Sequence, residues 1–113
     1  MRFSDVIAAL EGDILVEGDH LHDRVGHIVA TDLMSEVLLG EDDDLLMFTN
    51  LTTEHAVRTA HVMGALGVVV LAGKQPRPAM CRAATELGVT LAVTPLPRES
   101  VMTWAAAALP PPV

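Results

Sequence analysis

Small polar side chains and one lysine follow three apolar segments of the sequence, at the points where those segments end. These residues carry hydroxyl, amide and ammonium groups or lack a side chain: Thr49, Asn50, Thr52, Thr53, Gly73, Lys74 and Thr94. If the apolar segments are neighbouring parallel strands, the residues meet outside the carboxyl ends of the sheet, where α/β proteins bind ligands. Such a set suits an anion or a nucleotide, because helix N-termini add unpaired N–H groups there.

The expected ligand site has a positive and a hydrogen-bonding part. A helix beginning near Thr52 directs its positive end into the site, and Lys74 adds a full positive charge. Asp32 can accept a hydrogen bond from a ribose hydroxyl or an adenine amino group, and we expect Asp32 and Thr94 on the rim. The alternative is that the threonines only cap helices, where threonine is common.

The sequence predicts no catalytic residues. Gly73 and Lys74 follow a buried strand as in a phosphate-binding P-loop, but five residues separate Gly67 from Gly73, and Gln75 stands where that loop needs Ser or Thr. No Gly-x-Ser-x-Gly elbow occurs. We therefore expect that the protein is not an enzyme and needs no cofactor.

Histidines and a cysteine suggest metal or thiol chemistry only at first sight. His20, His22 and His27 lie close together in sequence, but no second compact pair of ligands accompanies them. His55 and His61 are six residues apart and do not share a helix face. We expect loop and surface histidines, no metal site, and a half-buried, unreactive Cys81.

The elements that would position these residues alternate between strands and helices. Strands are expected at 13–16, 27–30, 45–49, 68–72 and 89–93, with helices between residues 4 and 12, 32 and 40, 53 and 64, 78 and 88, and 97 and 110. Alternation of continuously apolar strands with helices over 45–109 predicts right-handed crossovers and a mostly parallel sheet. We expect one three-layer α/β/α domain over residues 1–113, with a proline-rich tail at 110–113.

Composition and charge exclude several classes of protein. The chain has 113 residues, half of them hydrophobic, and a net charge of −8. Residues 1–57 hold two basic and thirteen acidic residues, and 58–113 hold five and two. Without a Lys/Arg cluster, neither nucleic acid nor an anionic membrane is an expected partner. The longest apolar run is roughly half a membrane span, and the start of the chain lacks the apolar core of a signal peptide. A cytoplasmic location is therefore expected.

A small chain this rich in apolar residues should keep some apolar surface exposed. We therefore expect a homo-oligomer, most simply a homodimer. One candidate contact is the final Ala-rich helix, with Val101, Trp104 and Leu109.

Three stretches resemble the small stand-alone DRTGG-domain proteins: DLMSEVLL (32–39), LTTEHAVRTAHVMGALGVVVLAGKQP (51–76) and LGVTLAVTPL (87–96). The positions that match the family pattern are Asp32, Ser35, Leu51, Thr52, Arg58, Thr59, Ala60, Gly73, Lys74, Pro76 and Thr94. Two positions depart from it, because Asn50 replaces the usual glycine and Ala72 replaces the arginine before Gly73. The resemblance covers nearly the whole chain.

The resemblance implies a fold like the N-terminal domain of HPr kinase/phosphorylase and no catalytic activity. DRTGG domains accompany CBS domains in regulatory pyrophosphatases, where the regulatory region binds adenine nucleotides. This implies a regulatory or sensory module that binds a small anionic ligand, an adenine nucleotide. Short members of the family neighbour iron hydrogenase and histidine-kinase-like genes. The alternative is therefore an adaptor or assembly protein that acts through protein contacts, with partners of those kinds.

Overall fold

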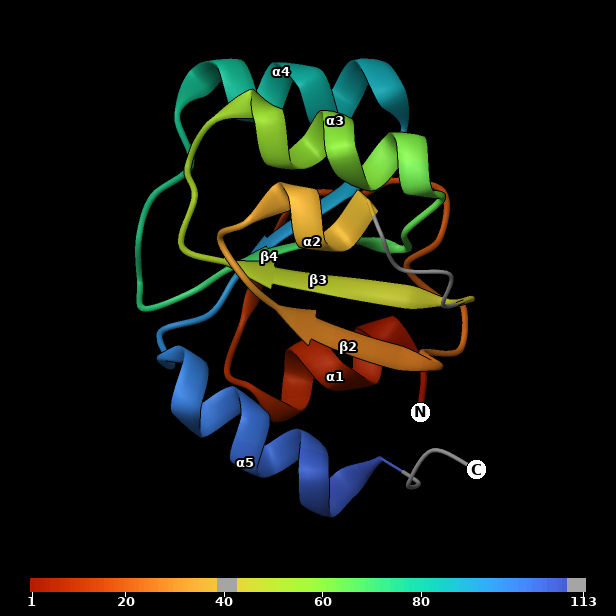
Figure 1. Ribbon diagram of the computed structural model, residues 1–113, viewed down its shortest axis with the longest axis vertical. Coiled ribbons are helices and arrows are strands. Elements are labelled where there is room, and N and C mark those ends of the chain that lie inside the picture. The colour runs from red at the N-terminus through yellow and green to blue at the C-terminus, as the bar shows by residue number, and fades with distance from the viewer. Residues whose placement is uncertain (39–42, 110–113) are drawn as a thin grey trace.

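The computed structural model describes residues 1–38 and 43–109, which form a five-stranded sheet between two layers of helices (Figure 1). The strands are β1 (Asp13–Val16), β2 (His27–Ala30), β3 (Leu45–Thr49), β4 (Gly67–Val70) and β5 (Thr90–Val93). The helices are α1 (Phe3–Ala9), α2 (Met34–Leu38), α3 (Glu54–Met63), α4 (Pro78–Leu87) and α5 (Arg98–Ala108). The predicted three-layer α/β/α architecture is confirmed.

The sheet has the order β1-β5-β4-β3-β2, and β2 to β5 are parallel. Three crossovers carry the chain from β2 to β5 one strand at a time, through α2, α3 and α4. Strand β1 pairs antiparallel with β5 and forms one edge, where a bulge between Ile14 and Val16 interrupts the register. Strand β2 forms the other edge of the sheet.

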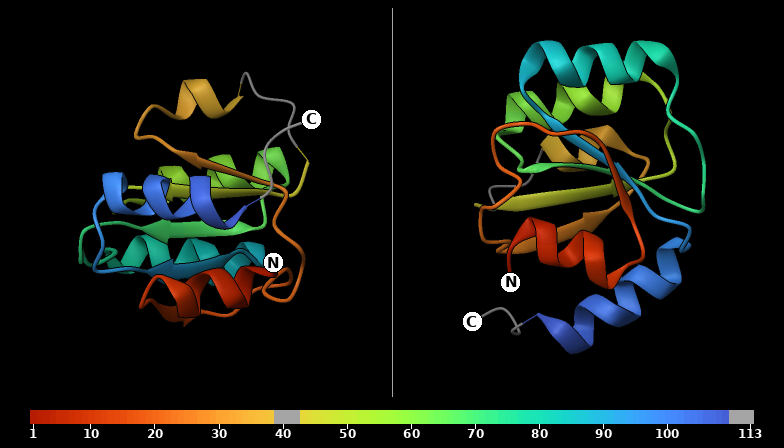
Figure 2. Two further views of the ribbon diagram at one scale, coloured as in Figure 1. Left: turned by 90° about the horizontal axis from the view of Figure 1, so that it is seen from below. Right: turned by 180° about the vertical axis from the view of Figure 1, so that it is seen from behind.

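Each face of the sheet has its own core. Alternate side chains of β3, β4 and β5, such as Met47, Val68 and Leu91, pack under α2, α3 and α4. Their neighbours in sequence, such as Phe48 and Val69, point to the opposite face, which α1 and α5 cover. Figure 2 shows these two layers from below and from behind. Because both faces are covered, β3, β4 and β5 consist of buried residues throughout, as the continuous apolar runs predict.

Helices α3 and α4 end at the residues that the sequence predicts. Gly64 and Gly88 end α3 and α4 in the left-handed conformation, with φ of 66° and 69°. Pro78 opens α4 at its first turn. Within the expected helix at 32–40, α2 is described over Met34–Leu38, and the expected end at Gly40 lies outside the described residues. The proline-rich tail at 110–113 also lies outside them.

Three expectations about the helices and strands are wrong in detail. The first helix, expected between residues 4 and 12, begins earlier, because Arg2 occupies the N-cap position of α1. The strand expected at 68–72 is β4 at Gly67–Val70, because the chain turns directly afterwards. Val101 is fully buried against the sheet, so this part of α5 belongs to the core and is not a contact surface for a second copy.

Gly67 marks the closest approach between a helix and the sheet. A Cβ atom at this position would lie 2.4 Å from Cε2 of Phe3 and 2.7 Å from the carbonyl oxygen of Thr90. The first turn of α1 can therefore reach the start of β4 only because residue 67 has no side chain.

None of the helices in the described ranges combines the length and the apolar character that crossing a bilayer requires.

We predict that Gly67→Ala lowers the free energy of unfolding by about 2–3 kcal/mol, since the added methyl group overpacks a closed contact. Gly64→Ala is the matched control, because nothing lies within 4 Å of the place where its Cβ would be and only its positive φ is strained. That variant should cost about 1 kcal/mol. Urea denaturation measures both, and equal losses would contradict the close contact at Gly67.

Candidate functional site

The ends of the four parallel strands lie side by side along one edge of the sheet, at the arrowheads in Figure 1. Backbone hydrogen bonds tie successive ends together. The N–H of Thr31 donates to Phe48, that of Leu71 to Thr49, and that of Gly73 to Thr94, at 2.9–3.0 Å. The expected convergence of the turns after β3, β4 and β5 is therefore confirmed. We call this side of the sheet, where the parallel strands end, the carboxyl edge; it is distinct from the two edge strands β1 and β2.

Asp32 holds the segments after β2 and β3 together. Its Oδ1 accepts hydrogen bonds from the hydroxyl of Thr49 at 3.0 Å and from the backbone N–H of Asn50 at 2.7 Å. The side-chain amide of Asn50 donates to Oδ2 at 3.3 Å. Asp32 and Asn50, two of the predicted site residues, are therefore in direct contact. Thr49, which donates to the same carboxylate, is fully buried.

The surroundings of Asp32 keep its carboxylate charged. Partial burial raises the pKa of Asp32, but the hydrogen bonds from Asn50 and Thr49 and the charge of Lys74 together outweigh burial and place the pKa below the usual 3.8. Lys74 is therefore close enough for its charge to act on the Asp32 carboxylate. The carboxylate and the ammonium group thus belong to one polar region.

Gly73 and Lys74 stand on a tight turn after β4. The N–H of Lys74 donates to the carbonyl of Leu71 at 3.2 Å, and the two central residues, Ala72 and Gly73, have φ of 58° and 67°. Two successive left-handed residues are typical of a type I′ turn. The turn leaves Lys74 exposed at the carboxyl edge.

Thr52 and Thr53 do not act as helix caps in this structure. Thr53 occupies the N-cap position of α3, but its side chain makes no capping hydrogen bond. Within the described part of the chain, no hydrogen bond involves the hydroxyl of Thr52, while its carbonyl accepts one from the N–H of Arg77 at 2.9 Å. Among the described residues, neither hydroxyl therefore caps α3, and Thr52 and Thr53 stay candidates for the site.

Thr94 does not lie on the rim of the site. Its side chain is fully buried, and its hydroxyl donates to the carbonyl of Leu10 at 2.7 Å and accepts from the N–H of Leu96 at 3.3 Å. The hydroxyl thus binds the C-terminal end of α1, a contact between residues 84 positions apart in sequence. The remaining predicted residues stay candidates for the site: Asp32, Asn50, Thr52, Thr53, Gly73 and Lys74.

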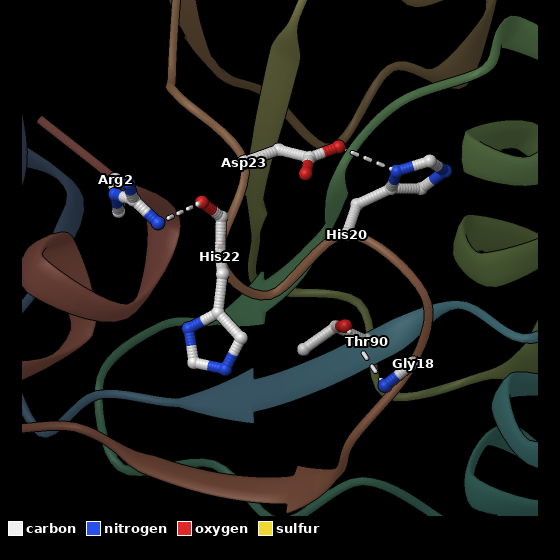
Figure 3. A network of polar contacts seen from close by, with 6 residues as sticks. All are labelled: Arg2, Gly18, His20, His22, Asp23 and Thr90. Carbon is white, nitrogen blue, oxygen red and sulfur yellow. Dashed lines mark hydrogen bonds and ion pairs between the residues drawn. The ribbon is translucent and has the colours of Figure 1, made fainter.

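The histidines of the loop 17–25 lie at the opposite edge of the sheet, which we call the amino edge. Figure 3 shows His20 paired with Asp23, with 2.7 Å between Nδ1 and Oδ2, and His22 pointing away from this pair. Among the residues that the structure describes, no three His, Cys, Asp or Glu side chains gather in a way that could hold a metal ion.

Comparison with known proteins identifies a solved structure with a similar fold. No protein-family model and no curated protein sequence matches this chain. Among solved structures, it is similar to the CBS and DRTGG domains of the regulatory region of Clostridium perfringens pyrophosphatase, complexed with the activator diadenosine tetraphosphate. The TM-score is 0.66 at 13% sequence identity, and the match covers 90% of this chain and 44% of that chain. The chain thus spans less than half the length of that regulatory region.

At this level of identity the similarity shows the fold alone. The chain has a mixed α/β fold, with a mostly parallel sheet flanked by helices, that is similar to part of this CBS and DRTGG region. Only the fold that the resemblance implies is confirmed.

We predict that Asp32→Ala lowers the free energy of unfolding by about 1 kcal/mol at pH 7, because three donors lose an ionised acceptor at an exposed site. A carboxylate whose pKa is lowered by folding stabilises the protein above its unfolded pKa, and this contribution disappears as the pH falls through the folded pKa. The difference between variant and parent should therefore be full at pH 7 and shrink below pH 3.8. Urea denaturation at several pH values measures it.

Glu17→Ala serves as the control, since Glu17 is an exposed carboxylate without a hydrogen bond to the described residues. A loss of stability with Asp32→Ala that persists unchanged at pH 2 would show that the hydrogen bonds to the charged form do not contribute.

Proposed function

We propose that this chain is a non-catalytic regulatory module that binds an adenine nucleotide at the carboxyl edge. The observation that carries the proposal is the fold. Its structural neighbour is a regulatory region complexed with diadenosine tetraphosphate, an adenine dinucleotide. The carboxyl edge of this chain independently gathers groups that suit such a ligand.

Each side chain of the proposed site has a role that its position supports. Lys74 is exposed and positively charged, so it would bind a phosphate group. The unpaired N–H groups at the start of α3 and the hydroxyls of Thr52 and Thr53 would bind further phosphate oxygens. Gly73, which has no side chain, leaves room beside Lys74.

Asp32 would orient the nucleoside part of the ligand. Its carboxylate is held charged by Asn50 and Thr49 and retains capacity for further donors, since a carboxylate offers about four lone-pair sites. A ribose hydroxyl or an adenine amino group is such a donor. In this role the chain would bind the nucleotide without breaking a bond in it.

We predict that Lys74→Ala and Thr52→Ala each weaken the binding of an adenine nucleotide. Removing the charge of Lys74 should cost about 1–3 kcal/mol of binding free energy, the range for a hydrogen bond to a charged group. Stability should change little, because Lys74 is exposed. Isothermal titration calorimetry with AMP, ADP, ATP and diadenosine tetraphosphate measures the affinities.

Arg82→Ala is the matched control, because Arg82 is an exposed cation on α4 outside the proposed site. Unchanged affinity in both Lys74→Ala and Thr52→Ala would place the nucleotide elsewhere. If the parent protein binds none of the four nucleotides, the proposal is wrong.

A second candidate is an assembly protein that acts through contacts with a second copy or another protein. It is favoured by Leu33 and Leu38, which lie at the two ends of α2 and are 59% and 51% exposed. Figure 2 shows α2 on the side of the sheet where β2 forms the edge. Apolar side chains beside an open sheet edge are typical of a protein contact surface.

For this second candidate we predict a homodimer at micromolar concentration, and a shift to monomer in the double variant Leu33→Asp, Leu38→Asp. A buried carboxylate without a partner strongly disfavours an interface. Light scattering gives the mass, and circular dichroism checks that the variant is folded. A parent protein that is monomeric throughout would exclude the homodimer.

A further inference from the structure

A cleft at the amino edge of the sheet has a composition unlike that of the carboxyl edge. It has a volume of about 220 Å³ and lies where α3 and α4 end, opposite the loop 17–25. Its polar lining comes from three elements: Asp19 and His20 of the loop, His61 of α3, and the two C-terminal glycines Gly64 and Gly88. Apolar side chains of Ala65, Leu87 and Val89 complete it.

Negative charge is concentrated around this cleft. Both α3 and α4 end at it, and a helix C-terminus carries about half a negative charge, although capping N–H groups here bond to the carbonyls of Ala60, His61 and Ala84. The carboxylate of Asp19 lies against the end of α4, with Oδ2 only 2.7 Å from the place where a Cβ on Gly88 would be. Asp19 is the one carboxylate among the described lining residues, and no lysine or arginine of the lining balances its charge.

This position is unfavourable for a carboxylate in the protein alone. An acidic side chain stabilises a helix at its N-terminus and destabilises it at its C-terminus. Within the described part of the chain, Asp19 has neither a salt bridge nor a side-chain hydrogen bond that would offset this cost. A bound cation would offset it.

The loop holds Asp19 firmly in this position. The N–H of Asp19 donates to the carbonyl of Gly88 at 3.0 Å, and the N–H of Gly18 donates to the buried hydroxyl of Thr90 at 2.9 Å. A Cβ on Gly18 would lie 2.4 Å from the carbonyl oxygen of Gly88, so only glycine allows this approach. On the other side, the pair of His20 and Asp23 closes the loop (Figure 3). The backbone that carries the exposed Asp19 side chain is therefore held in place.

A second, larger hollow is lined by side chains of both signs of charge. It has a volume of about 610 Å³ beside the start of α1, and Arg2 and Arg24 line it together with Asp5, Asp23 and Asp44. Its positive and negative groups compensate one another, so it does not select one sign of charge.

We infer that the cleft between α3, α4 and the loop 17–25 binds a small organic cation, an aliphatic amine or guanidine. Its N–H groups would donate to the Asp19 carboxylate, at the negative ends of α3 and α4. Its methylene groups would lie against Leu87 and Val89. An organic cation fits better than a metal ion, because no three metal-ligating side chains gather among the described residues. This site is separate from the proposed nucleotide site and does not depend on it.

Calorimetry on the full chain with agmatine, which carries both an ammonium and a guanidinium group, tests the inference. In about 0.15 M salt, where long-range attraction to an acidic protein is screened, the parent should bind one equivalent. Asp19→Asn should weaken binding at least about tenfold, as expected when a charged hydrogen bond is lost. Glu17→Gln, which removes a charge from the same loop outside the cleft, should bind like the parent.

Thermal unfolding without ligand provides a second, independent measurement. If Asp19 is an unfavourably placed carboxylate kept for binding, Asp19→Asn should raise the Tm, by about 3 °C. A fall in Tm would show instead that the carboxylate has a structural role.

The inference is wrong if the parent does not bind agmatine at about 1 mM, a concentration that detects even weak sites. It is also wrong if Glu17→Gln and Asp19→Asn weaken binding equally, because the attraction would then come from the overall charge of the chain.

Discussion

The parallel pairing of β2 to β5 decides the direction of the helices that connect them. A crossover must leave the carboxyl end of one strand and return to the amino end of the next, so α2, α3 and α4 all begin at the carboxyl edge. Their unpaired N–H groups gather there, and their unpaired carbonyls gather at the amino edge. The two edges of the sheet therefore differ in electrostatic character before any charged side chain is considered.

Charged side chains add to the positive character of the carboxyl edge and to the negative character of the amino edge, or reduce it. Lys74, on the turn after β4, adds positive charge to the carboxyl edge, where Asp32 balances part of it. At the amino edge, Asp19 adds a negative charge to one that the helices already supply. The placement of Asp19 is therefore less favourable for α4 than that of a cation would be, whereas Asp32 is stabilised by its hydrogen bonds.

The central fold could be predicted from sequence because its signals are local. The apolar run at 45–49 has no polar residue that would indicate an open face, and Gly64 and Gly88 each end an amphipathic segment. The end of β4 was harder to predict, since Ala72 adopts a left-handed conformation that is uncommon for a residue with a Cβ. A propensity argument extends the strand through such a residue.

The site was predictable only where it depends on strand order. Asn50 and Asp32 follow neighbouring parallel strands, so their contact follows from the topology. The burial of Thr94 depends on α1, which reaches the end of β5 from the far end of the chain. The cleft at the amino edge likewise joins Asp19, His61 and Gly88, which no spacing in the sequence connects.

The bulge at Leu15 has a consequence for how the protein behaves at high concentration. An open edge strand is a template on which further strands add, and a regular one leads to fibrils. Strand β1 exposes Ile14 and Leu15, both at least 40% accessible, and would be a clear hazard if it were straight. The irregular register interrupts the row of backbone groups that an incoming strand would need. Repairing the bulge by deleting Leu15 would remove this protection, even though it would make the sheet more regular.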